Sequence, residues 1–347
     1  MSDFALRIMD WQRQNGRRDL PWQLDRDPYR VWLSEIMLQQ TQVATVIPYF
    51  TRFISRFADL PSLAAANSDD VLACWSGLGY YSRARNLQAA AQRVVRDFGG
   101  VFPSRPEDMI CLPGIGRSTA AAIAAFCFGA RAAIMDGNVK RLLARHFGVH
   151  GFTGTRATEL RLWTLAESLL PSAGCDVYTQ AQMDMGALLC TRSRPQCNRC
   201  PVADSCVALA TQQVASLPTP KPKSAQALPH KTAQFVILHH AGRIWLEQRP
   251  PQGIWGGLWS FPELSALADT ASVCRDTWRL NVVGIRIEPG FRHQFTHFAL
   301  TIVPCWVEIA ELPLTIAGQG GWWAQPEAAL KAAIPAPVRK ILMQGPG

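Results

Sequence analysis

Two hydrophobic periodicities divide the chain. Up to about residue 210, apolar residues recur every three or four positions between Pro and Gly breaks, which predicts amphipathic helices. The clearest of these stretches are residues 31–46, 69–75, 84–98 and 156–170. Later the period becomes two, because Phe235 and Ile237 precede a His240-Ala-Gly242 turn and Ile244 and Leu246 follow it. The pattern predicts an all-helical part followed by a β-rich α+β part.

A proline-rich stretch separates the two patterns. It contains Leu217-Pro-Thr-Pro-Lys-Pro-Lys-Ser224, which suits neither a regular helix nor a central strand. We therefore expect a helical domain at residues 1–211, a linker at 212–230 and a second domain at 231–347. With 347 residues, 48% of them hydrophobic, the chain is long enough for two separate cores.

Charge and cysteine content narrow the class of protein. The net charge of +9 suits a polyanionic partner without proving one. The longest apolar run, residues 120–130, is shorter than the roughly 20 residues that span a bilayer. We therefore expect a buried helix there, no membrane partner and, since the N-terminus has no signal-peptide pattern, a cytoplasmic protein. Ten cysteines occur, of which four crowd into residues 190–206, and this distribution points to metal in a reducing compartment.

These four cysteines form the strongest metal-binding pattern. Their order is Cys190-x6-Cys197-x2-Cys200-x5-Cys206, which brings four soft thiolates onto one loop. Such a loop suits a 4Fe-4S cluster or an all-cysteine zinc site. The spacing alone leaves the metal open.

A glycine-containing turn precedes the apolar run. In Cys111-Leu-Pro-Gly-Ile-Gly116, the two glycines allow backbone amides at a helix N-terminus to contact phosphates. An isolated turn of this kind is more often an ordinary helix connection. This turn, however, resembles that of the helix-hairpin-helix DNA glycosylase superfamily, in which a catalytic aspartate follows about 20 residues later. Here Asp136 lies 20 residues after Gly116, and the hairpin would span about 105–130.

Two carboxylates suit the cleavage of an N-glycosidic bond. That reaction needs an acid for the leaving base and negative charge near the sugar cation. Glu35 has mostly apolar helix neighbours, so we expect a raised pKa. Asp136 precedes a helix expected to start near Asn138, the candidate cap, and should stay ionised. Taken singly, each carboxylate also fits a structural role, as a surface Glu or as a capping Asp.

Longer motifs resemble one family within that superfamily. Residues 33–43, 77–86 and 112–120, together with the cysteine loop, are similar to the adenine DNA glycosylase (MutY) family over roughly residues 4–340. The resemblance implies that Glu35 protonates adenine, that Asp136 stabilises the sugar cation and that Asn138 supports it. It also implies one 4Fe-4S cluster and, as partner, double-stranded DNA with adenine opposite 8-oxoguanine or guanine.

The resemblance assigns further residues. Gln40 would wedge into the duplex and Tyr80 would stack beside the mispair. The adenine pocket would comprise Arg18, Leu20, Trp22 and Gln180. Other DNA contacts would come from Leu112, Gly114, Ile115, Gly116, Ser118 and Lys140.

The second domain resembles a Nudix fold in residues 253–263. A Nudix hydrolase needs an Arg-Glu and a Glu-Glu pair for magnesium, and neither dipeptide occurs. The resemblance therefore implies recognition of 8-oxoguanine by Thr296 and His297 in Phe295-Thr-His297, where the family has Phe-Ser-His. Threonine keeps the hydroxyl but restricts its rotamers.

Two other functions are alternatives to adenine removal. An endonuclease III-like bifunctional lyase on oxidised pyrimidines would need a lysine where this chain has Ser118, and a hydroxyl forms no Schiff base. A non-catalytic DNA-binding iron-sulfur protein would not need Glu35 and Asp136. We expect a monofunctional enzyme, and a monomer whose protein partners the sequence does not identify.

Overall fold

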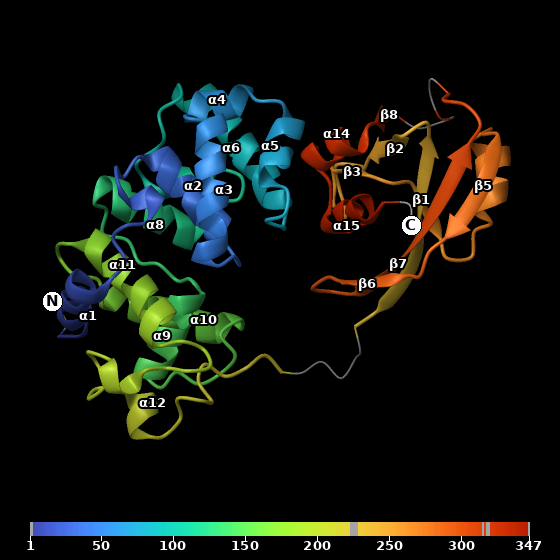
Figure 1. Ribbon diagram of the computed structural model, residues 1–347. Coiled ribbons are helices and arrows are strands. Elements are labelled where there is room, and N and C mark those ends of the chain that lie inside the picture. The colour runs from blue at the N-terminus through green and yellow to red at the C-terminus, as the bar shows by residue number, and fades with distance from the viewer. Residues whose placement is uncertain (1–2, 223–227, 314–315, 317–319, 346–347) are drawn as a thin grey trace. The chain divides into compact units, whose positions relative to one another are not determined.

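The computed structural model describes residues 3–222, 228–313, 316 and 320–345 (Figure 1). The chain divides into two compact units. The first, here the helical unit, comprises Met1–Ala65 and Asn86–Lys223, and the second, here the sheet unit, comprises Ala66–Arg85 and Ser224–Gly347. The expected fold class, an all-α part followed by an α+β part, is confirmed.

Helices account for the regular structure described in the helical unit. An isolated bridge between Phe152 and Thr219 is the β-pairing recorded there. The α-helices are α1 (Asp3–Asn15), α2 (Pro28–Leu38), α3 (Val43–Arg56), α4 (Leu60–Ala65), α6 (Ser82–Phe98, shared with the sheet unit), α7 (Pro106–Ile110), α8 (Arg117–Phe128), α9 (Gly137–His146), α10 (Arg156–Ser168), α11 (Cys175–Asp184) and α12 (Val207–Ala210). Short helical segments are η1 (Pro21–Gln23), the π-helix η2 (Met185–Leu189) and η3 (Cys197–Arg199).

Helix α8 occupies the middle of this unit. Its run of buried residues from Ala120 to Ala125 is mostly alanine, so neighbouring helices can approach it closely. Helices α2 and α11 both pack against it. The N-terminal helix α1 lies along α11, near the other end of the unit's sequence (Figure 1). No helix in the described ranges has the length and apolar character needed to cross a membrane.

The predicted helix over residues 31–46 is instead two helices. Helix α2 ends at Leu38 and α3 begins at Val43. Between them Gln40 has a φ of 59°, which a right-handed helix does not allow. The other three predicted helical stretches correspond to α5 (Ser68–Trp75), α6 and α10.

The sheet unit contains eight described strands in one sheet. The central pair, β1 (His230–His240) and β7 (Ala299–Ile309), is parallel, and the path is β3-β2-β1-β7-β5. The predicted turn at Ala241 and Gly242 joins β1 to β2 (Arg243–Gln248) as an antiparallel hairpin. The remaining strands are β3 (Trp259–Ser260), β4 (Glu263–Ser265), β5 (Val282–Ile287), β6 (Phe291–Gln294) and β8 (Gly321–Ala324).

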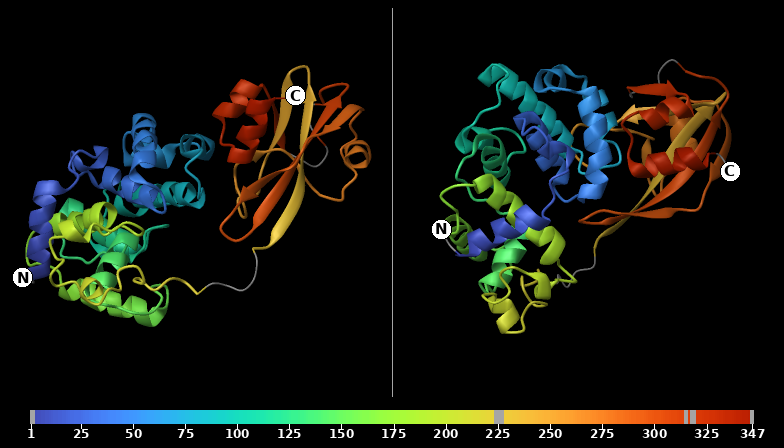
Figure 2. Two further views of the ribbon diagram at one scale, coloured as in Figure 1. Left: turned by 60° about the horizontal axis from the view of Figure 1, so that its bottom comes forward. Right: turned by 60° about the vertical axis from the view of Figure 1, so that its left-hand side comes forward.

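Both faces of this sheet are covered. Along β1, Phe235 and Ile237 belong to one core, and Val236 and Leu238 to the other. Helices α14 (Pro326–Lys331) and α15 (Ala336–Gln344) cover the first face; α13 (Thr270–Ser272) and the π-helix η4 (Val273–Thr277) cover the second (Figure 2). Burial on both faces explains why residues 235–238 of β1 are all apolar, with no alternation of polar and apolar side chains.

The unit boundaries differ from the expected domains at two places. Residues 66–85, which include α5, group with the sheet unit: Asp69 accepts hydrogen bonds from Gln248 (2.9 Å) and the Trp259 indole (3.3 Å). The expected linker 212–230 begins too early, because Leu217 is buried and Thr219 Oγ1 accepts a hydrogen bond from the Gly151 amide (3.1 Å). Residues 223–227 of that linker lie outside the described part.

The hairpin between α7 and α8 depends on one glycine. Gly114 has a φ of 78°, and a Cβ there would lie 2.9 Å from Asn86 Cβ. We expect Gly114→Ala to lower the free energy of unfolding by about 2–4 kcal/mol, through both backbone strain and overpacking. Urea unfolding followed by circular dichroism measures this.

Gly116 provides the matched control. Its φ is −92° as the N-cap of α8, and nothing lies within 4 Å of an added Cβ. Gly116→Ala should cost under about 1 kcal/mol. Equal losses in the two variants would contradict the assignment of strain to Gly114.

Candidate active site

A cavity of about 390 Å³ opens within the helical unit. Its volume falls in the range of small-molecule sites, roughly 300–1,000 Å³. The structure brings together here Glu35 and all four predicted pocket residues, Arg18, Leu20, Trp22 and Gln180. Sequence reasoning missed several other lining residues, among them Gln23, Ser34, Phe126 and Met183.

Glu35 lies on α2 and lines the cavity. Asp27 caps this helix by accepting from the Arg30 amide (3.0 Å), and Pro28 fixes the first turn. Residues 31–34, 36 and 37 are all buried. Desolvation, with a smaller contribution from the charge of Asp136, raises the pKa of Glu35 to about 8.

Asp136 lies just before α9 and is its N-cap. The carboxylate accepts hydrogen bonds from the Val139 amide (2.7 Å) and from the Asn138 side chain (3.3 Å). The expectation that Asn138 is the cap was wrong, because α9 begins one residue earlier, at Gly137. Burial raises the pKa of Asp136, while its hydrogen bonds and the charge of Arg141 oppose that rise.

The two carboxyls therefore differ in their partners. Four interactions favour the charged form of Asp136. No interaction recorded among the described residues favours the charged form of Glu35 to a similar extent. The charge of Asp136 itself opposes ionisation of Glu35. When only one of the two carries a proton, Glu35 holds it. The charge of Asp136 acts on Glu35, although Asp136 is not among the residues that line the cavity.

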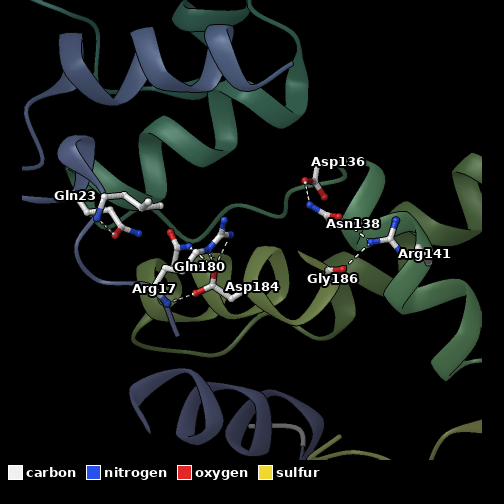
Figure 3. Close-up of polar contacts among 9 residues, drawn as sticks. Arg17, Gln23, Asp136, Asn138, Arg141, Gln180, Asp184 and Gly186 are labelled. Atoms are coloured by element: carbon white, nitrogen blue, oxygen red, sulfur yellow. Dashed lines mark hydrogen bonds and ion pairs between the residues drawn. The ribbon is translucent and has the colours of Figure 1, made fainter. Parts of the chain in front are cut away.

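Arg141 joins Asn138 to the cysteine loop. Its guanidinium donates to Asn138 Oδ1 (2.8 Å), to the Gly186 carbonyl (2.7 Å) and to the Cys190 carbonyl (2.7 Å). Figure 3 shows the contacts from Asp136 through Asn138 and Arg141 to Gly186. The position of Asn138 thus depends on the segment that leads into the cysteines.

The four predicted ligand cysteines line one small cavity, about 30 Å³ in volume. Burial and the neighbouring thiols raise the pKa of Cys200 to about 11, and Arg145 Nη1 lies 3.4 Å from Cys190 Sγ. In the described residues no three His, Cys, Asp or Glu side chains are arranged as for a single metal ion. Four thiols around one cavity beside a guanidinium fit a thiolate-bound group of negative charge.

The side chains predicted to lie at the DNA-binding hairpin are mostly buried or already paired within the protein. Leu112 and Ile115 are 2% and 4% exposed, so phosphate contacts there would come from the main chain. Ser118 Oγ accepts a hydrogen bond from the Met135 amide (2.9 Å) and so positions the segment before Asp136. Lys140 is paired with Glu159 (2.7 Å).

Other predicted residues are exposed. Gln40 and Tyr80 each have a positive φ, 59° and 48°, which is uncommon for residues other than glycine. In the sheet unit, Thr296 and His297 are exposed in the turn between β6 and β7, flanked by the stacked rings of Phe295 and Phe298 (centroids 4.5 Å apart).

Comparison with known proteins agrees with this geometry. Residues 33–168 match the HhH-GPD superfamily of base excision DNA repair proteins, and residues 233–344 match the NUDIX domain. A solved thermostable thymine-DNA glycosylase is similar with a TM-score of 0.55 and 28% identity, covering 60% of this chain and 95% of that one. Fold and site thus define a DNA glycosylase of base excision repair.

Full-length relatives narrow the family. An adenine DNA glycosylase of Buchnera aphidicola subsp. Acyrthosiphon pisum is 36% identical over 98% of this chain and 96% of its own. The human adenine DNA glycosylase is 32% identical over 96% of this chain and 72% of its own. The chain belongs to the adenine DNA glycosylase family.

The raised pKa of Glu35 predicts the pH dependence of base release. Only the protonated carboxyl donates, so the single-turnover rate should be maximal below pH 8 and fall about tenfold per unit above it. Glu35→Gln should lower the rate by about 10²–10⁴-fold and abolish this descending limb. A wild-type rate that stays constant up to pH 9.5 would show that another group is the acid.

The close packing of Gly186 predicts a coupled loss. A Cβ at Gly186 would lie 2.4 Å from Asn138 Cβ, so Gly186→Ala must displace Asn138 or the π-helix η2. We expect about 1–3 kcal/mol of destabilisation and slower base release. Gly137→Ala, where an added Cβ meets nothing within 4 Å, serves as control and should be near neutral in urea unfolding. Unchanged stability and base release in Gly186→Ala would contradict this packing argument.

Proposed function

We propose that this enzyme hydrolyses the N-glycosidic bond of adenine mispaired with 8-oxoguanine or guanine in double-stranded DNA. The observation that carries the proposal is the cavity in which a carboxyl with a pKa near 8 faces Arg18, Trp22 and Gln180. An acid at the wall of a cavity of this volume suits protonation of a leaving base. The relatives named adenine DNA glycosylase, matched over nearly the whole chain, support adenine as that base.

The chemistry uses both carboxyls. Glu35 donates its proton to N7 of adenine, and the base leaves with the electron pair of the bond to the sugar. The Asp136 carboxylate, supported by Asn138, stabilises the positive charge on the sugar or bonds to it transiently. Water then adds to the sugar carbon, displaces Asp136 where that bond has formed, and gives one proton to the now ionised Glu35 carboxylate. The products are free adenine and an abasic site.

The reaction should stop at the abasic site. Strand cleavage by an endonuclease III-like lyase needs an amine nucleophile. Ser118 offers a hydroxyl that already accepts a hydrogen bond from Met135. Lys140 is held in an ion pair with Glu159. These contacts favour the monofunctional reaction over the bifunctional alternative.

DNA contacts would come from the hairpin and from two strained residues. Main-chain amides around Gly114 and Gly116 suit phosphate binding at the start of α8. Backbone strain often marks functional positions, which supports Gln40 as the wedge and Tyr80 as the stacking residue. We place the enzyme, as a monomer, on the DNA of a bacterial cytoplasm.

One 4Fe-4S cluster would be held by Cys190, Cys197, Cys200 and Cys206. Their shared cavity and the guanidinium of Arg145 beside Cys190 suit an anionic cluster. When bound, the cluster would order residues 190–206. Arg141, which contacts both the Cys190 carbonyl and Asn138, would then be held in place for catalysis.

The exposed turn of the sheet unit would read 8-oxoguanine. Thr296 offers a hydroxyl and His297 a ring nitrogen, both on a turn bounded by aromatic side chains. The sequence contains neither dipeptide needed for Nudix hydrolysis, which supports recognition as the role of this fold.

One assay tests the substrate. Protein of measured iron content is used for single-turnover reactions on duplexes with adenine opposite 8-oxoguanine, guanine or thymine. We expect fast release opposite the first two, slow release opposite thymine, and strand breaks only after alkali. Equal rates on all three duplexes would contradict the mispair proposal, and breaks without alkali would favour the bifunctional alternative.

Two substitutions at Thr296 test whether its hydroxyl contributes to the recognition of 8-oxoguanine. Thr296→Val keeps the shape but removes the hydroxyl, and should lower the preference for 8-oxoguanine over guanine by about 3–10-fold, the effect of one hydrogen bond. Thr296→Ser should keep the preference. Full preference in Thr296→Val would exclude the hydroxyl from recognition.

A further inference from the structure

Asp184, at the end of α11, is fully buried beside the cavity. Its carboxylate accepts hydrogen bonds from the Arg17 amide (3.0 Å) and from Arg17 Nε (2.7 Å), and Arg17 Nη2 lies 2.6 Å from it. The Gln180 side-chain amide, one turn earlier on the same helix, donates to Oδ1 (2.9 Å). Figure 3 shows these contacts converging on Asp184.

This arrangement fixes the orientation of the Gln180 amide. The guanidinium of Arg17 neutralises the carboxylate, and an ionised carboxylate only accepts hydrogen bonds. The Gln180 nitrogen must therefore face Asp184, since turning the amide would set two oxygens against each other. Gln180 lines the cavity, and its oxygen, turned away from Asp184, remains able to accept a hydrogen bond from a bound base.

An oxygen at this wall distinguishes purines by the group at position 6. Adenine carries an amino group there, which donates a hydrogen bond, whereas guanine and hypoxanthine carry a carbonyl oxygen, which accepts one. A fixed acceptor favours the first and repels the second. A site built to hydrogen-bond one group discriminates strongly against an analogue that leaves it unpaired.

We propose that Asp184 is a positioning residue that holds Gln180 with its oxygen toward the base, so that the cavity selects 6-aminopurines over 6-oxopurines. The inference rests on the proposed function, because it takes adenine as the base in the cavity. Asp184 touches no substrate and acts through Gln180.

The test compares bases rather than rates alone. Single-turnover release of adenine, hypoxanthine and unsubstituted purine is measured opposite the same 8-oxoguanine, in wild type and in Asp184→Asn. An asparagine can donate to the Gln180 oxygen and let the amide turn. We expect the adenine-to-hypoxanthine rate ratio to fall at least about tenfold, while the purine-to-hypoxanthine ratio changes less.

Two further variants separate orientation from stability. Asp184→Glu keeps an acceptor-only group and should retain the adenine-to-hypoxanthine ratio even if all rates fall. Gln180→Leu removes the amide and should abolish the preference for adenine over hypoxanthine. In the double variant, adding Asp184→Asn to Gln180→Leu should change the adenine-to-hypoxanthine ratio no further. Gln180→Leu also tests the oxygen if Asp184→Asn does not fold, because full discrimination without the amide overturns the proposal.

The outcomes are distinct. If wild type releases no adenine, the proposed function fails and not merely this inference. If wild type releases adenine but Asp184→Asn slows all three bases by the same factor, Asp184 is only structural and the inference is wrong. A fall in the ratio that persists unchanged in Asp184→Glu would likewise show that packing around residue 184, and not the presence of an acceptor, sets selectivity.

Discussion

Burial of carboxyl groups is the constraint on which the catalytic part of this molecule depends. A buried carboxylate is costly unless it is protonated or paired, so each one must have a partner that determines its state. No strong donor to Glu35 occurs among the described residues, and Glu35 keeps its proton up to a pH of about 8. Asp136 has helix amides and Asn138. Asp184 has the guanidinium of Arg17. The same residue chemistry thus gives an acid, an anion and a fixed acceptor.

These partners lie on elements whose positions depend on how the helices pack against α8. The small side chains of α8 allow α2 and α11 to approach it, and α11 carries both Gln180 and Asp184. Arg141 links the site to the cysteine loop through the Cys190 carbonyl. A disturbance in that loop would reach Asp136 through Arg141 and Asn138, without any contact between the cysteines and a substrate.

The sequence predicted the elements better than their boundaries. Periodicity identified α5, α6, α10 and the β1–β2 hairpin, because each buries one regular face. It missed the break at Gln40, since a positive φ in a non-glycine residue leaves no compositional sign. It also assigned residues 66–85 to the helical domain, because an amphipathic helix does not reveal which core its apolar face joins.

The site was predicted unevenly for a similar reason. Glu35, Asp136 and the cysteines stand in motifs with distinctive spacing, and the four pocket residues do line one cavity with Glu35. Asp184 has no motif around it. Its spacing of four residues from Gln180 places both on one helix face, but only the fold brings Arg17 to the same carboxylate. Residues that orient a site are therefore harder to predict from the sequence than residues that perform its chemistry, because their role depends on contacts between distant parts of the chain.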